Sequence, residues 1–184
     1  GYGTAVTQPC MYHGMDHLGI AQYLTRIGLW LAGTAELEDG RSHWLGDGRW
    51  QPLRRQVENS LVVKDWFELF VAQNLVQDGL LYPLVYAHFV DRRLNAEGGS
   101  AVSMVCAFMN EWFAESTRWV DATIKTAAAE SPANAALIAG WLAYWRDRVR
   151  EALLPVAELA FDQDGEKVLD TVTEAFDARV AKLG

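Results

Sequence analysis

The fold is decided by residues 102–125, VSMVCAFMNEWFAESTRWVDATIK, which predict one long helix with two different faces. The stretch contains no Pro or Gly, and at about 100° per residue its large apolar side chains gather on one side. That inner face comprises Val102, Val105, Met109, Trp112, Phe113, Ser116, Trp119, Val120, Thr123 and Ile124. The outer face carries Glu111, Glu115, Arg118, Asp121 and Lys125, in which Asp121 can pair with Lys125. Ser116 is a small polar residue where a bulky one is expected.

Helical spacing recurs on both sides of this stretch. Further helices are predicted at residues 10–31, 34–45, 52–60, 65–95, from 132 onward, and about 166–183. We expect residues 1–9 to be irregular, Pro83 to kink its helix, Ser100 to be an N-cap, and Pro155 to bend or end its helix. No stretch alternates with period two. The sequence therefore predicts an all-α single domain over residues 1–184, with at least three long helices around a common axis.

Composition excludes several classes of protein. The formal net charge is −8, which argues against a nucleic-acid partner, because phosphate binding needs a concentrated basic face. No segment reaches the roughly 18 apolar residues of a membrane span. Two cysteines, Cys10 and Cys106, do not make a disulfide scaffold and suit a reducing cytoplasm. Eight Trp indicate a large core or a partner surface. The chain begins with Gly and lacks a signal peptide, so we expect a fragment of a longer cytoplasmic protein.

Polar residues on otherwise apolar stripes form the candidate site. A buried polar group must be paired, so these side chains are predicted to meet one another or trapped water. The predicted cluster comprises His13, His17, Asn74, Asp78 and Ser116. Two kinds of metal site remain open at this point. Cys10, His13 and His17 have spacing that can hold a zinc ion on one helical face, and histidines with carboxylates in a long-helix bundle suggest a di-iron centre.

The di-iron hypothesis can be tested against the sequence. Such sites use two Glu-x-x-His motifs and a Glu from each of two further helices. The residues three positions before the four histidines are Cys10, Gly14, Gly40 and Val85, so no Glu-x-x-His exists in the sequence. Motifs of other enzyme classes, G-x-S-x-G, Walker A and G-x-G-x-x-G, are also absent. These absences count strongly against di-iron ligation by this chain alone.

Four runs resemble a known family. They are KDWFELFVAQNLVQDGLLYPLVY (64–86), EWFAESTRWVDATIKT (111–126), EALLPVAE (151–158) and MYHGMDHLGIAQYLTRIGL (11–29). They are similar to the smaller, ferritin-like β subunit of bacterial multicomponent phenol hydroxylases, over about the C-terminal half of such a subunit. The β subunits of toluene, alkene and propane monooxygenases are related. The resemblance implies a ferritin-like long-helix bundle with extra short helices.

The resemblance also implies a non-catalytic role. In this superfamily the larger α subunit carries the di-iron centre, and catalytic relatives show an Asp-Glu-x-Arg-His pattern on two helices. Residues 16–20 align with that pattern, with His17 in the place of the Glu and Ile20 in the place of the His. Residues 115–119 also align with it, with Ser116 in the place of the Glu and Trp119 in the place of the His. No catalytic, cofactor-binding or metal-binding residue is therefore expected in this chain.

The cofactors and partners implied by the resemblance belong to other chains. They are a di-iron α subunit, a γ subunit, a regulatory protein and an NADH-dependent reductase with FAD and an iron–sulfur cluster, in an α2β2γ2 assembly that hydroxylates aromatic hydrocarbons for catabolism. Trp66, Trp141 and Trp145 would serve the interface or the core. The alternatives are an independent helical metalloprotein using Cys10, His13, His17 and Asp78, the β subunit of an alkene or propane monooxygenase, or a free-standing helical interaction protein.

Overall fold

The all-α prediction is confirmed in the computed structural model, which describes residues 3–183. Every regular element of this part of the chain is helical. The chain divides into two compact units, one up to Gln51 and one from Pro52 on. Each unit is described by itself below. That both units form one domain remains a prediction.

The first unit is a helical hairpin of α1 (Thr4–Ala32) and α2 (Thr34–Gly46). Gly33 joins the two helices with φ 79°, a conformation that favours glycine, and its N–H donates to the Leu29 carbonyl at 3.0 Å. From Thr4 on the predicted irregular lead-in is wrong, because α1 begins at Thr4 and runs through Pro9; residues 1–2 of that prediction lie outside the described residues. Pro9 is the sixth residue of α1, so it removes one backbone hydrogen bond, the one its N–H would donate to the Ala5 carbonyl, and the helix continues past it for 23 residues to Ala32.

The second unit begins at the second residue of the short helix α3 (Gln51–Ser60), a helix that agrees with the prediction. A nearly continuous helix follows through α4 (Trp66–Phe70), η1 (Val71–Gln77), α5 (Asp78–Tyr82) and η2 (Pro83–Leu94). Asp65 caps its start by accepting hydrogen bonds from the backbone N–H groups of Phe67 and Glu68. The η1 and η2 segments are π-helical, with i→i+5 hydrogen bonding. Pro83 is the first residue of η2, where the helix changes type, and the predicted kink at this proline remains a prediction.

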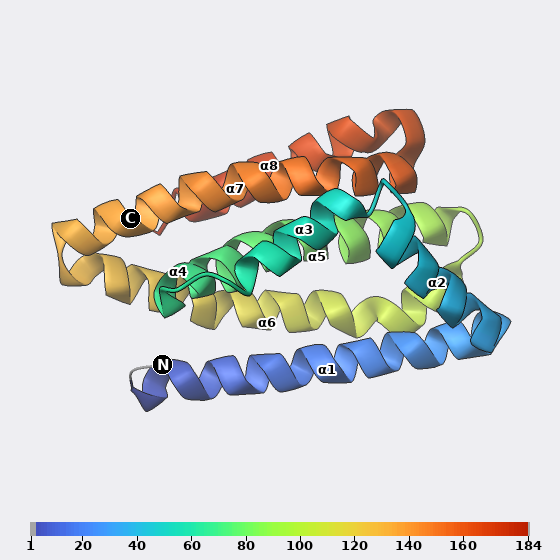
Figure 1. The fold of residues 1–184 in the computed structure, drawn as a ribbon, viewed down its shortest axis with the longest axis horizontal. Helices are drawn as coiled ribbons and strands as arrows, with labels where there is room; N and C mark the ends of the chain where they lie inside the picture. The colour runs from blue at the N-terminus through green and yellow to red at the C-terminus, as the bar shows by residue number, and fades with distance from the viewer. Residues whose placement is uncertain (1–2, 184) are drawn as a thin grey trace. The chain divides into compact units, whose positions relative to one another are not determined.

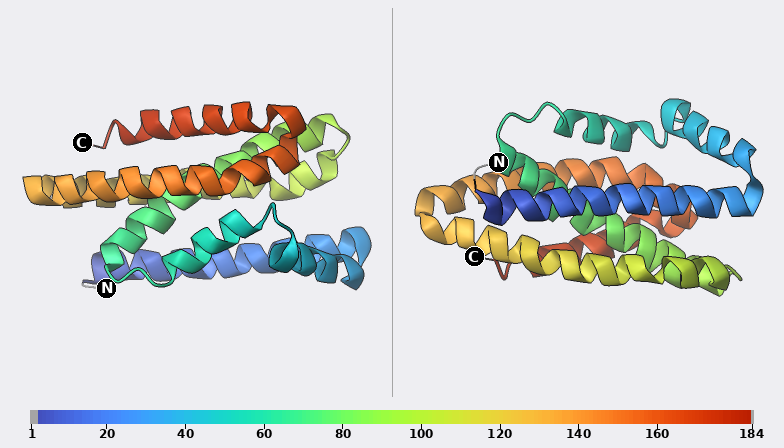
Figure 2. Two further views of the ribbon diagram at one scale, coloured as in Figure 1. Left: turned by 45° about the horizontal axis from the view of Figure 1, so that its top comes forward. Right: turned by 90° about the horizontal axis from the view of Figure 1, so that it is seen from below.

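Three further helices complete this unit: α6 (Ser100–Glu130), α7 (Pro132–Phe161) and α8 (Gly165–Val180), the last preceded by the 3₁₀ turn η3 (Asp162–Asp164). Consecutive helices run antiparallel because the links between them are short (Figure 1). The α6 helix packs against η2 and α7, and α7 also packs against η1 and α8. The left view of Figure 2 shows α8 running alongside α7. Fully buried Leu75, Met109 and Leu153 mark the core between these helices.

Two local predictions in this unit need correction. Gly99, and not Ser100, is the N-cap of α6. Pro155 does not end its helix, since α7 continues for six residues to Phe161; that it bends the helix remains a prediction. Ala152, Leu153, Val156 and Ala157 are all buried around this proline, and their packing offsets the lost backbone hydrogen bond.

Candidate functional site

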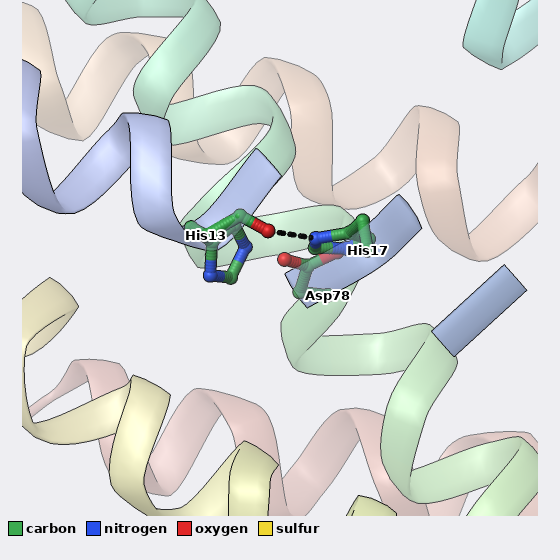
Figure 3. A group of neighbouring side chains, drawn as sticks. All are labelled: His13, His17 and Asp78. Carbon is green, nitrogen blue, oxygen red and sulfur yellow. Dashed lines mark hydrogen bonds between the residues drawn. The ribbon is translucent and has the colours of Figure 1, made fainter. Parts of the chain in front are cut away.

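Two of the predicted site residues stand one helical turn apart on α1. His17 Nδ1 lies 2.9 Å from the carbonyl oxygen of His13, and because a carbonyl can only accept, Nδ1 carries the proton and donates (Figure 3). The two imidazole rings meet edge to face, with centroids 4.5 Å apart. Their ligand nitrogens lie within 4.8 Å of each other. This pair has the spacing of a two-histidine chelate on one helix.

Cys10 does not complete that pair into the predicted zinc site. Within residues 3–183, the Cys10 sulfur does not join the two histidines in a group whose ligand atoms all lie within 4.8 Å. The thiol is half-buried, and burial raises its pKa above the ordinary value. A raised pKa disfavours the thiolate that binds zinc. The geometry of α1 therefore supports the histidine pair as candidate ligands and not the three-residue set.

Asp78 is the buried carboxylate of the second unit. It is the first residue of α5, and 3% of its surface is exposed. Its Oδ1 accepts a hydrogen bond from Gln73 Nε2 at 2.9 Å, and Gln77 Nε2 donates in turn to Gln73 Oε1 at 3.3 Å. The wide turn of η1 brings residues five apart, such as Gln73 and Asp78, onto one face. Sequence reasoning missed both glutamines, because α-helical spacing places neither beside Asp78.

The other predicted members of the cluster sit on neighbouring helices of the same unit. Ser116 is buried on α6 and Asn74 is half-buried on η1. The outer carboxylates of α6, Glu111 and Glu115, are exposed, as the helical pattern predicts. Whether the five predicted residues meet as one cluster remains a prediction.

The positions that the resemblance assigns to lost metal ligands hold side chains of a different kind. Ile20 is a buried aliphatic residue on α1. Trp119, on α6, is half-buried with its ring 5.5 Å from that of Phe70. Neither an aliphatic side chain nor an indole that packs in this way offers iron a donor atom. The residues in this frame do not fit a carboxylate-bridged di-iron centre.

Asp121 departs from its predicted place on the solvated face of α6. Its carboxylate pairs with the guanidinium of Arg179 on α8, with Arg179 Nη2 donating to Oδ1 at 2.6 Å and Nε at 3.0 Å. Both side chains are mostly buried, at 26% exposure for Asp121 and 19% for Arg179. On α7, Arg146 pairs with Asp177 of α8, and Arg150 with Asp170. The mostly buried pair of Asp121 and Arg179 joins α8 to α6, whereas the two pairs with α7 are more exposed and stabilise the packing of α8 less.

The tryptophans divide between core and surface. Trp145 is buried, and its indole N–H donates to Glu68 Oε1 at 3.1 Å. Trp66 is 37% exposed and Trp141 is half-buried.

No helix of residues 3–183 is long and apolar enough to cross a bilayer.

The helical architecture and the sequence of residues 1–131 point to one class of protein. Those residues match the family described as Methane/Phenol/Alkene Hydroxylase, and the chain belongs to this family.

Individual relatives sharpen the match. The chain is 52% identical over 181 residues to the oxygenase component DmpL of phenol 2-monooxygenase from Pseudomonas sp. (strain CF600), covering 97% of this chain and 54% of the relative. It is 41% identical to the oxygenase component MhpL of phenol 2-monooxygenase from Acinetobacter pittii (strain PHEA-2), covering 100% of this chain and 55% of the relative. The hydroxylase β subunit of toluene-4-monooxygenase from Ectopseudomonas mendocina is more distant, at 32% over 67% of this chain and 37% of its own length.

A solved structure supports the same assignment. The crystal structure of xenon-pressurized phenol hydroxylase from Pseudomonas sp. OX1 superposes with a TM-score of 0.90 at 42% identity, over 97% of this chain and 54% of that chain. The chain thus spans about half the length of the relatives it matches. The predicted resemblance to the smaller oxygenase subunit is confirmed at the level of the family.

Proposed function

We propose that this chain acts as part of a non-catalytic subunit in the oxygenase component of a multicomponent phenol hydroxylase. The similarity to two phenol 2-monooxygenase oxygenase components supports the substrate class, since the propane monooxygenase relatives are only 27–29% identical. The observation that supports the non-catalytic role is the chemistry at Ile20 and Trp119. In the frame that the resemblance implies, these side chains without usable donor atoms would stand where the family's catalytic subunits place histidine.

The di-iron centre that activates O₂ would belong to a larger α subunit. Electrons would reach it from NADH through a reductase with FAD and an iron–sulfur cluster, and a γ subunit and a regulatory protein would complete an α2β2γ2 assembly. This chain would contribute a stiff helical wall. The mostly buried pair of Asp121 and Arg179 suits that role, because it holds α8 against α6.

Metal analysis of the separated subunits tests the proposal. The full-length subunit that contains this chain, purified alone, should hold no stoichiometric iron, and hydroxylation of phenol should require a larger iron-containing partner. Within the reconstituted oxygenase, Ser116→Ala and Trp119→Phe should leave iron per assembly and its spectroscopic signature unchanged. Two irons per isolated subunit would refute the non-catalytic role.

One alternative rests on a specific observation. The spacing of His13 and His17 would suit a zinc- or copper-binding helical protein. In that case His17→Ala should remove a bound metal ion that the wild-type protein retains through dialysis. A metal-free preparation that supports full phenol hydroxylation after reconstitution with its partners would reject it.

A further inference from the structure

An apolar pocket lies in the second unit at the junction of η1, α6, α7 and the end of α8. Its volume is about 240 Å³. Leu75, Ile124 and Ile138 line its inner wall and are 0%, 2% and 6% exposed, so the pocket reaches into the core. It is therefore deeper than a gap between surface side chains.

Alanines create the space. Ala128 and Ala129 on α6 and Ala135 and Ala139 on α7 line the pocket, close to where Ser131 links these two helices. Methyl side chains at four positions leave a hollow that leucines would fill. Apart from Lys125, every side chain that lines the pocket is aliphatic.

The size and lining select a class of ligand. A dry apolar cavity of about 150 Å³ is large enough to bind benzene or xenon. The present pocket is larger and has no side-chain group apart from Lys125 that would hold water firmly. A single aromatic ring therefore fits it in both volume and chemistry.

Lys125 adds a polar edge. Its side chain lines the pocket and is exposed, so the ammonium group is at the rim while the carbon stem covers apolar surface. Its predicted partner Asp121 is engaged by Arg179 instead. Within residues 3–183, Lys125 forms no ion pair or hydrogen bond through its side chain. The ammonium can thus donate to an oxygen atom on a bound ring.

We propose that this pocket binds one monocyclic aromatic molecule with a hydroxyl substituent, its ring against Ile124 and Ile138 and its oxygen at Lys125. The pocket alone carries this inference, which does not depend on the proposed function. It places an aromatic site in the second unit of this chain.

Methyl NMR on the full-length subunit in its native assembly tests the proposal. The δ1 methyl signals of Ile124 and Ile138 report on the pocket directly, whereas binding elsewhere leaves them in place. Titration with phenol should shift both signals and saturate with a Kd of the order of 1 mM, an affinity suited to a ligand of seven heavy atoms. Benzene should shift the same signals at a several-fold higher concentration.

Matched variants separate the two halves of the proposal. Ala139→Leu should fill the pocket and weaken both ligands at least 10-fold, whereas Ala136→Leu, on the same helix outside the pocket, should leave binding unchanged. Lys125→Met should weaken the binding of phenol about 3- to 10-fold and leave the binding of benzene unchanged. The control Lys167→Met, which lies outside the pocket, should leave the binding of both ligands unchanged.

Several results would overturn the proposal. Absence of shifts at both isoleucines, or wild-type affinity in Ala139→Leu, would show that the pocket is not a binding site. Equal loss of phenol and benzene in Lys125→Met would remove the role of the ammonium. Because the readout is binding, it can fail while the metal analysis upholds the proposed function, and the reverse also holds.

Discussion

The same change, glycine to alanine, should have opposite effects at three helical positions of the second unit. At Gly140 in α7 an added Cβ would meet nothing within 4 Å. At Gly79 in α5 it would lie 2.8 Å and 2.9 Å from two ring carbons of Phe176. At Gly165, the first residue of α8, it would lie 2.6 Å from both Cα and N of Glu158. The three sites differ in whether the obstacle is absent, movable or fixed.

These distances set the magnitudes. The Gly140→Ala variant gains helix propensity, so its free energy of unfolding should rise by about 0.5–1 kcal/mol. In Gly79→Ala the buried Phe176 ring must shift, and this overpacking costs about 1–3 kcal/mol. After the gain in helix propensity is subtracted, the free energy of unfolding should fall by about 1 kcal/mol. At Gly165 backbone must retreat by about 1 Å to reach ordinary contact, so the loss should be at least about 3 kcal/mol. Gly165 has φ −54°, which suits any residue, so this cost is purely steric.

Urea unfolding of the full-length protein, followed by tryptophan fluorescence and circular dichroism, measures the series. The expected order of stability is Gly140→Ala, wild type, Gly79→Ala, Gly165→Ala. Phe176→Leu should reduce the cost of Gly79→Ala in the double variant, since a smaller side chain leaves room for the methyl group. A Gly165→Ala protein as stable as Gly140→Ala would refute the steric reasoning and the close approach of α8 to α7.

Three further predictions concern charge. Asp78→Ala should lower the free energy of unfolding by about 1–3 kcal/mol, because it leaves the amide of Gln73, which also accepts from Gln77, without its buried acceptor. A loss below about 1 kcal/mol would show that Asp78 is solvated. A double-mutant cycle with Asp121→Asn and Arg179→Met should give a coupling free energy of about 1–3 kcal/mol. The same cycle for the more exposed pair Arg54 and Glu58 should give about 0–0.5 kcal/mol. Equal coupling energies would contradict the burial of the first pair. Two causes raise the pKa of Tyr86 from 10.0 to about 12: mainly burial of its hydroxyl, and to a smaller extent the electrostatic effect of Cys106. Since the unfolded chain loses this proton at a lower pH than the folded one, the free energy of unfolding should fall by roughly 2–3 kcal/mol between pH 10 and 12. Tyr86→Phe should remove this fall when unfolding is measured against pH. An unchanged fall in the variant would exclude Tyr86 as its source.

Periodicity predicted the helices well because each long helix buries one face. The apolar stripe of α6 is an example: Met109, Val120 and Ile124 are buried as the 3.6-residue period requires. Exact ends were less predictable. Pro155 and Pro9 lie inside helices whose packing or position offsets the missing donor, and a local rule for proline does not include that compensation.

The polar residues show a different limit. Asp121 has a favourable partner four residues later, yet it pairs with Arg179, which is 58 positions away in the sequence. A local pairing rule cannot anticipate a helix that returns from so far along the chain. The link from Gln73 to Asp78 was missed for another reason, because its spacing of five belongs to a π-helix and periodicity analysis assumes an α-helix. No simple residue signal in 71–94 announces that change.

The π-helical segments also affect how this protein tolerates substitution. In an α-helix, positions sensitive to polar replacement recur about every 3.6 residues. Across Val71–Gln77 and Pro83–Leu94 each turn holds more residues, so sensitive positions should recur at a longer interval than in α6 or α7. Comparisons of variants that assume uniform helical spacing will therefore assign residues after Pro83 to the wrong face. Single-residue deletions here could restore α-helical geometry locally, at the cost of rotating every downstream side chain.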